Sequence, residues 1–305
     1  MKAVAFVSPP PLEPGSRVAL IAPAGPLRNP GELDQAMANA RGFGWEPVPG
    51  AHVLARHGYL GGTDEQRLSD LNGAIRDPAI DGIWCVRGGY GVLRLLARLD
   101  AAALRGAPKA LIGFSDITAL HAAIGRCAGV VTYHGPTARA PLDGLSRDSL
   151  ERAVVRRSDS AGDAPEAEIL IPGVTHGRLA GGNLALLSSL AGTPYFPELE
   201  GAIVVLEDVN EPVYRIDRML RHLWLTGALG RIAGLMFGSF TERGDSDDSL
   251  PLAQVLRETA EAVGVPCLSG VPVGHIDAQW TLPLGAAAEL DATNRRLTIV
   301  HVAHT

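Results

Sequence analysis

Short apolar segments alternate with helix-length amphipathic segments along most of this chain, and this alternation limits the folds open to it. In the first half, residues 17–22, 80–86 and 109–114 read as buried strands. Residues 64–75 between them carry leucine and isoleucine at helical spacing, and a second helical pattern follows Gly91. Strands that alternate with helices form a largely parallel sheet with helices on its faces, so the sequence predicts an α/β fold.

A change of composition near the middle of the chain predicts a division into two domains. Residues 141–176 are rich in Arg, Asp, Ser, Glu and Pro, and we interpret them as a linker with a short helix at 149–157. We expect an amino-terminal parallel-sheet α/β domain over residues 1–140 and a smaller carboxyl-terminal α/β domain over 177–305. In the second domain we predict helices at residues 182–190 and 212–225 and strands at residues 202–206 and 232–237.

The composition argues against several classes of protein. A net charge of −6 over 305 residues leaves no basic surface for a phosphate backbone, so we expect no nucleic-acid partner. The three cysteines, Cys85, Cys127 and Cys267, are widely spaced and have apolar neighbours, which is typical of reduced thiols and not of a disulfide framework or a zinc site. We find no secretory signal and no apolar run of the ~20 residues that a membrane span needs. The expected compartment is the cytoplasm.

In residues 110–120, ALIGFSDITAL, a hydroxyl and a carboxylate stand where a predicted strand ends and a predicted helix begins. Ser115 and Asp116 could simply cap that helix, since both residue types accept hydrogen bonds from the free N–H groups of a first turn. Open α/β sheets, however, bind ligands at the carboxyl ends of their strands. A serine there could be a nucleophile, with the Asp116 N–H facing a developing oxyanion. The pattern G-x-S-x-G is incomplete, so both interpretations stay open on these residues.

A glycine-rich loop, VRGGYG at residues 86–91, also follows a strand and precedes a helical pattern. Such loops expose backbone N–H groups and allow a ligand to approach closely. A tight turn or a phosphate cradle would need the same glycines, but neither G-x-G-x-x-G nor a P-loop is present. We expect the Gly89 N–H to be the second oxyanion donor.

A serine nucleophile needs a general base, and the base needs an acid that orients it. His275 is the best-placed base because it follows a short strand and opens a loop, and His134 in YHGP is its main competitor. Glu207 is the candidate acid because it ends the apolar run AIVVL. Together with Asp208 and Glu211 it could instead bind a divalent cation or start a helix.

Six segments occur here in the same order as in the LD-carboxypeptidases, the serine peptidases that include muramoyl-tetrapeptide carboxypeptidase. In chain order they are CVRGGYG, IGFSDIT, YHGP, GGNLALLSSLAGTPY, LEDVNEPVYRIDRML and GH…LPLG. The chain therefore resembles that family from about residue 17 to 290. The resemblance implies an amino-terminal α/β domain, a linker and a carboxyl-terminal domain, with Ser115 as nucleophile, Glu207 as orienting acid and His275 as base. It also implies a cytoplasmic homodimer that uses no metal or other cofactor.

The implied reaction is hydrolysis of the amide that joins an L-configured centre to the terminal D-alanine of a murein tetrapeptide, in cell-wall recycling. Arg87 is our candidate partner for the substrate carboxylate, because a guanidinium matches a carboxylate bidentately. The loop GHIDAQW departs from the family pattern, and we expect Trp280 in it to line the substrate cleft. Three alternatives stay open. One is a metal-dependent hydrolase built on Glu207, Asp208 and Glu211. The family includes microcin C immunity proteins, which hydrolyse peptidyl or aminoacyl nucleotides and would need an aromatic platform such as Trp280 or Tyr195. The chain could also be a non-catalytic ligand-binding module.

Overall fold

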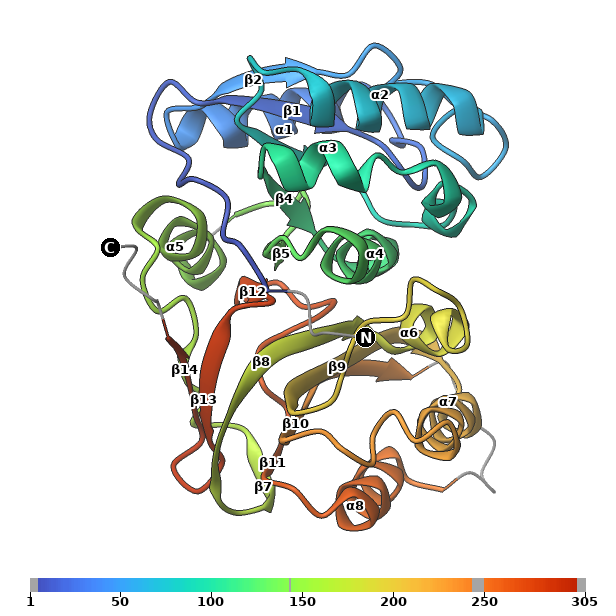
Figure 1. Cartoon of the computed structure of the whole chain (residues 1–305), viewed down its shortest axis with the longest axis vertical. Helices are drawn as coiled ribbons and strands as arrows, with labels where there is room; N and C mark the ends of the chain where they lie inside the picture. Colours follow the sequence, from blue (N-terminus) through green and yellow to red (C-terminus); the bar gives the residue numbers. More distant parts are fainter. Residues whose placement is uncertain (1–4, 143, 243–249, 301–305) are drawn as a thin grey trace.

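The computed structural model describes residues 5–142, 144–242 and 250–300 and contains two sheets, one above the other in Figure 1. The first sheet has the strand order β12-β5-β4-β3-β1-β2. Its first five strands in sequence are parallel, and β12 runs antiparallel to β5 at one edge. The strands are β1 (Arg17–Ile21), β2 (Glu46–Pro49), β3 (Gly82–Cys85), β4 (Ala110–Gly113), β5 (Thr132–His134) and β12 (Leu282–Leu284).

Alternate residues of the central strands enter two separate hydrophobic clusters, one on each face of this sheet. On β1, Ala19 and Ile21 belong to one cluster, and Val18 and Leu20 belong to the other. This alternation follows from the two-residue period of a strand, and burial on both faces accounts for the unbroken apolar runs. Helices contribute to both clusters; they are α1 (Gly31–Gly42), α2 (Asp64–Arg76), α3 (Ala101–Gly106) and α4 (Thr118–Ala128).

The helical pattern after Gly91 forms tighter turns than the α-helix that its spacing suggests. Two 3₁₀ turns, η1 (Val92–Arg94) and η2 (Leu96–Arg98), occupy this stretch. The N–H of Val92 is bonded to the Asp116 carboxylate, and the following turns close by bonds between residues three apart. The Asp116 carboxylate thus satisfies the first backbone N–H of this stretch, and the three-residue bonds of the 3₁₀ turns satisfy those that follow.

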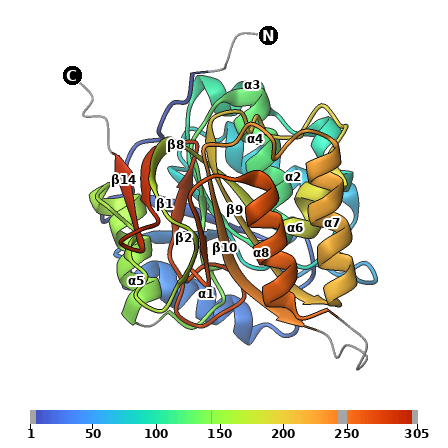
Figure 2. The same cartoon turned by 90° about the horizontal axis from the view of Figure 1, so that it is seen from below.

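The second sheet has the strand order β6-β14-β13-β8-β9-β10-β11-β7, of which β8 to β11 are parallel neighbours. The helices α6 (Leu184–Leu190), α7 (Val213–Leu225) and α8 (Leu252–Val263) contribute to the cluster on one face, where Figure 2 shows α7 and α8 side by side. The strands are β6 (Gly162–Asp163), β7 (Glu168–Ile171), β8 (Val174–Asn183), β9 (Ala202–Glu211), β10 (Gly234–Glu242), β11 (Cys267–Ser269), β13 (Ala287–Asp291) and β14 (Arg296–Val300).

These two sheets confirm the predicted α/β class with its parallel amino-terminal sheet. The segment that we interpret as a linker contains α5 (Gly144–Glu151), a π-helical turn (Arg152–Arg156), β6 and β7. Both of those strands pair in the second sheet, whereas β12 returns from the second half of the chain to the first sheet. The domain limits at residues 140 and 177 stay a prediction. Among the described helices, none has the length and apolar character required to cross a membrane.

Candidate active site

Ser115 lies on a sharp turn between β4 and α4. The strand ends at Gly113, Phe114 is extended, and Ser115 has a φ of 66° before the short 3₁₀ turn η3 (Ser115–Ile117) begins. A left-handed backbone costs a non-glycine residue roughly 1–2 kcal/mol, so the surrounding structure must enforce it. The half-buried Ser115 is thus held on a strained strand-to-helix turn at the carboxyl end of the parallel strand β4.

His275 and Glu207 reach this turn from the second half of the chain. His275 Nε2 lies 3.1 Å from Ser115 Oγ, and His275 Nδ1 lies 2.8 Å from Glu207 Oε2. Because a carboxylate can only accept, the Nδ1–H donates to Glu207 and leaves the Nε2 lone pair for the serine hydroxyl. This arrangement can remove a proton from Ser115 and stabilise the imidazolium that results.

Burial and packing hold the histidine and the acid in place. Glu207 lies on β9 with its side chain 0 % exposed, and the His275 side chain is 22 % exposed. The Phe114 ring packs against the His275 ring with centroids 4.8 Å apart. Gly274 has a φ of 116°, and a Cβ there would come within 2.9 Å of Glu207 Oε2. Only glycine therefore brings the histidine loop this close to the acid.

The glycine-rich loop lies directly beside the serine. A Cβ on Gly88 would stand 2.9 Å from Ser115 Cβ, and Gly25 N–H donates to Gly88 O at 3.0 Å. Gly89 has a φ of 116° and is exposed. The Asp116 N–H lies in the first turn of η3, where backbone donors have no partner within the helix. Gly89 and Asp116 stay our predicted oxyanion donors.

The structure separates the acidic residues that follow AIVVL. The Asp208 carboxylate accepts bonds from Asn183 Nδ2 and Ala185 N at 2.9 Å each, away from Glu207, because consecutive strand residues face opposite sides. Burial raises the pKa of Asp208 to about 6. Glu211 lies 3.5 Å from Arg215. Within residues 5–142, 144–242 and 250–300, no three His, Cys, Asp or Glu side chains are grouped to hold a metal ion.

His134, the competing base, lies behind Phe114 and makes no hydrogen bond to Ser115. It is 0 % exposed, and its ring centroid lies 6.0 Å from that of Phe114. Burial is the main reason why the pKa of His134 falls to about 3, with smaller contributions from His121 and His275. His121 is buried as well, and its Nε2 lies 2.8 Å from Gly113 O.

The two predicted substrate-binding side chains differ in their access to solvent. Arg87 is half-buried beside the glycine-rich loop, and its guanidinium donates to Pro26 O. Trp280 is 2 % exposed and belongs to a hydrophobic cluster of the second sheet, so its ring offers no open stacking surface.

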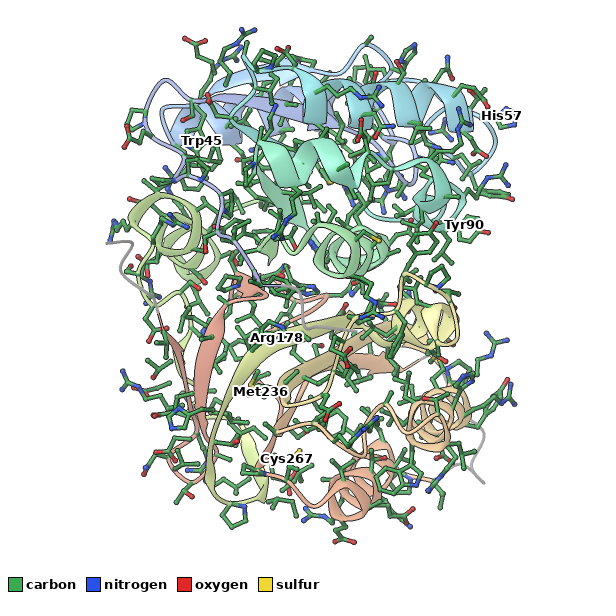
Figure 3. All side chains as sticks on the ribbon, in the orientation of Figure 1. Trp45, His57, Tyr90, Arg178, Met236 and Cys267 are labelled. Carbon is green, nitrogen blue, oxygen red and sulfur yellow. The ribbon has the colours of Figure 1, made fainter. Side chains whose placement is uncertain are left out.

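Two exposed tyrosines form an aromatic pair that our sequence reasoning missed. Tyr59 and Tyr90 are 68 % and 50 % exposed, and their rings meet edge to face with centroids 5.6 Å apart. Tyr90 lies at the edge of the amino-terminal domain that faces the second domain (Figure 3). The signal available in the sequence was an aromatic residue inside VRGGYG, next to the predicted oxyanion donor Gly89. By contrast, Tyr195 is half-buried and packs against the hydrophobic cluster that contains Ala19 and Ile21.

Comparisons with known proteins identify the family of this chain. Residues 18–135 match the LD-carboxypeptidase N-terminal domain, and residues 176–290 match the LD-carboxypeptidase C-terminal domain. A putative carboxypeptidase of Streptomyces coelicolor is 41 % identical, with 96 % of each chain covered. The murein tetrapeptide carboxypeptidase of Pseudomonas aeruginosa is 37 % identical over 92 % of this chain and 94 % of its own.

Two further relatives extend the comparison. The crystal structure of muramoyltetrapeptide carboxypeptidase from Oxalobacter formigenes superposes with a TM-score of 0.82 at 28 % identity, covering 93 % of this chain and 98 % of that one. The microcin C7 self-immunity protein of Escherichia coli is 28 % identical, over 79 % of this chain and 80 % of its own. From its two matched domains and these relatives, the chain belongs to the LD-carboxypeptidase family.

Proposed function

We propose that this protein is a serine carboxypeptidase that releases the terminal D-alanine of murein tetrapeptides. The observation that carries the proposal is the hydrogen-bonded chain from Ser115 through His275 to Glu207. The names of the Pseudomonas and Oxalobacter relatives support the substrate class.

In the proposed reaction, Ser115 Oγ attacks the carbonyl carbon of the L-centre, and His275 Nε2 takes the hydroxyl proton. The N–H groups of Asp116 and Gly89 hold the oxyanion of the tetrahedral intermediate. When the carbon–nitrogen bond breaks, His275 returns the proton to the leaving amine of D-alanine. A water molecule then attacks the acyl-enzyme with His275 as base, and Ser115 regains its proton. Glu207 keeps the tautomer of His275 and stabilises its charged form throughout.

We assign the substrate carboxylate to Arg87. Burial lowers the pKa of Arg87, and the neighbouring Arg139 and Arg28 lower it further, whereas Glu32 raises it. Because the Arg87 guanidinium lies mostly among other cations, binding of an anion beside it is electrostatically favourable. Arg87 directly precedes Gly88 and Gly89 in the chain, which supports a carboxylate site near the predicted oxyanion donors.

The test is product analysis after incubation with a murein tetrapeptide. We expect release of D-alanine by the wild-type protein and none above background by Ser115→Ala. Ser189→Ala, which removes an exposed hydroxyl on α6, is the matched control and should keep the wild-type rate. Release of D-alanine by Ser115→Ala at the wild-type rate would show that the proposed nucleophile is wrong.

A second candidate function is hydrolysis of an aminoacyl nucleotide, as in the immunity branch of the family. The exposed Tyr59–Tyr90 pair favours it, because aromatic rings at the rim of a site can stack on a base. Incubation with an aminoacyl-sulfamoyl nucleoside beside the tetrapeptide separates the two functions. Cleavage of the nucleoside alone, lost in Ser115→Ala, would assign the protein to the immunity branch. If an activated serine-directed phosphonate fails to label Ser115 and neither substrate is cleaved, the protein is a binding module.

A further inference from the structure

The peptide group between Gly91 and Val92, at the end of the glycine-rich loop, is held between two buried charged side chains. Arg67 Nη1 donates to Gly91 O at 2.9 Å, and Val92 N–H donates to Asp116 Oδ2 at 2.9 Å. Gly91 O and Val92 N belong to one planar peptide unit, so the two bonds grip both of its polar ends. Arg67 and Asp116 are each 1 % exposed. We name these two side chains and the peptide between them the loop clamp.

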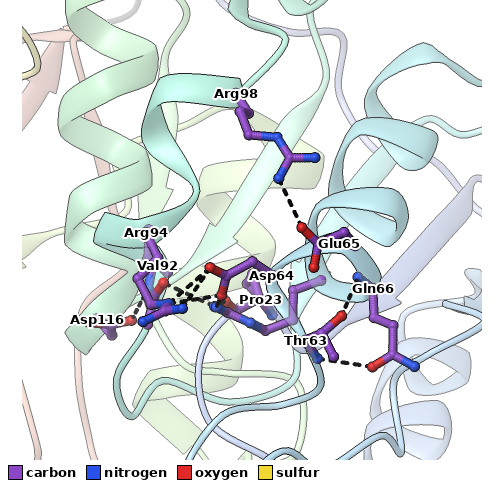
Figure 4. Close-up of polar contacts among 11 residues, drawn as sticks. Pro23, Thr63, Asp64, Glu65, Gln66, Val92, Arg94, Arg98 and Asp116 are labelled. Carbon is purple, nitrogen blue, oxygen red and sulfur yellow. Dashed lines mark hydrogen bonds and ion pairs between the residues drawn. The ribbon is translucent and has the colours of Figure 1, made fainter.

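The loop clamp joins three separate parts of the first domain, and Figure 4 labels its Val92 and Asp116. Arg67 comes from α2, Asp116 follows the proposed nucleophile Ser115, and the peptide ends the loop after β3. The same guanidinium donates to Pro23 O at 2.5 Å, in the loop after β1, and its Nη2 lies 2.6 Å from Asp64 Oδ1. Arg67 therefore bonds to two neighbouring loops at the carboxyl edge of the sheet.

The backbone at Gly91 is shaped for this contact. Gly91 has a φ of 131°, which side chains rarely adopt, and a Cβ there would stand 2.7 Å from Arg67 Nη1. The guanidinium can approach this closely only because the residue has no side chain.

Burial makes the loop clamp sensitive to the loss of either side chain. A charged group taken out of water costs several kcal/mol unless hydrogen bonds replace its hydration. Bonds to an ionised partner are about twice as strong as neutral ones. A guanidinium at the carbonyl and a carboxylate at the N–H therefore hold the plane of this peptide more tightly than ordinary backbone partners would.

Orientation is what an oxyanion hole requires, because its donors act only if they already point to the developing charge. Gly89, our predicted donor, lies two residues before Gly91, is exposed, and has no side chain to anchor it. The bond from Gly25 N–H to Gly88 O holds the peptide unit that carries the Gly89 N–H, and the loop clamp holds the chain two residues further on.

We propose that Arg67 and Asp116 are positioning residues, which hold the glycine-rich loop so that the Gly89 N–H meets the oxyanion. Asp116 would then contribute twice, through its own N–H as a donor and through its carboxylate as an anchor. The inference rests on the proposed serine carboxypeptidase function. Since an oxyanion hole binds the transition state and not the ground state, loss of the anchor lowers kcat and leaves KM unchanged.

The experiment measures kcat and KM for D-alanine release from a murein tetrapeptide. We expect Arg67→Met and Asp116→Ala each to lower kcat by about 10²–10³-fold, the loss typical of one oxyanion donor, with KM within about twofold of wild type. Asp116→Asn keeps one carbonyl acceptor for the Val92 N–H and should recover most of the activity lost in Asp116→Ala. Arg94→Met is the matched control, because exposed Arg94 pairs with the same Asp64 but not with the loop; it should leave kcat and KM unchanged.

Circular dichroism and urea unfolding establish that each variant is folded. If Arg67→Met or Asp116→Ala does not fold, Arg67→Lys and Asp116→Asn decide the question, with an expected kcat loss of about tenfold because each keeps part of the bonding. Wild-type kcat in these folded variants, or a rise in KM equal to the whole loss of efficiency, overturns the loop clamp. Ser115→Ala is assayed alongside. If it keeps its turnover, the proposed function fails; if it is inactive while the clamp variants are fully active, only the clamp fails.

Discussion

Replacement of His134 by phenylalanine should make the protein less sensitive to acid. The His134 ring is fully buried against Phe114, and neither ring nitrogen has a hydrogen-bond partner among the described residues. The fold therefore favours the neutral imidazole and lowers the pKa of His134 from 6.5 to about 3. In the unfolded chain the same side chain takes a proton near its ordinary pKa.

The sign and size of the effect follow from this difference. Below pH 6.5 the unfolded state binds more protons at residue 134 than the folded state does, so the free energy of unfolding falls as the pH falls. The loss is about 1.4 kcal/mol per pH unit, or about 2 kcal/mol at pH 5. This is a substantial part of the ~5–15 kcal/mol by which proteins are stable.

Urea unfolding of wild type and His134→Phe at pH 7.5 and pH 5 measures this contribution. Phenylalanine keeps an aromatic ring against Phe114, and the other buried groups titrate in both proteins. The difference in unfolding free energy between variant and wild type should shift by about 2 kcal/mol in favour of the variant at pH 5, at equal m-values. The reasoning is wrong if that difference is the same at both pH values.

Two substitutions test the surroundings of the proposed nucleophile. Gly88→Ala would bring a Cβ within 2.9 Å of Ser115 Cβ, so the serine must move, and we expect kcat to fall at least about 10²-fold, because a displaced nucleophile leaves attack geometry. Gly73→Ala in α2 meets no atom within 4 Å; it should keep full activity and gain up to about 1 kcal/mol of stability, which makes it the control. Arg87→Ala should raise KM for the tetrapeptide about tenfold by removing a charged hydrogen bond, but not for a tetrapeptide with an amidated carboxyl terminus. Equal losses with both peptides would contradict the carboxylate role of Arg87.

The α/β class could be predicted from the sequence because strands and helices leave local periodic patterns. Strand β1 (Arg17–Ile21) and helix α2 (Asp64–Arg76) lie within one residue of their expected limits. Glycine and proline marked the turns, and the end of each apolar run marked where a strand meets its ligand-binding loop. Ser115 and Glu207 were chosen on that basis. The homodimer, the domain limits and the catalytic roles stay predictions.

Contacts between distant segments could be decided only by the tertiary structure. The sequence puts His134 at the end of an apolar run and predicts a short strand before His275. In the structure His134 is the last residue of β5, and residues 270–274 before His275 form no strand. Only the tertiary structure shows that His134 packs behind Phe114 while His275 reaches Ser115, 160 residues away in the chain. Trp280 reads as a loop residue but is buried, because the strand after it returns to the first sheet.

Arg67 shows the same limit most clearly. No pattern in the sequence singles out Arg67, yet its guanidinium is buried against the glycine-rich loop. Local patterns report which face of an element is apolar. They do not report which other segment covers that face, since pairing between elements depends on packing over the whole chain.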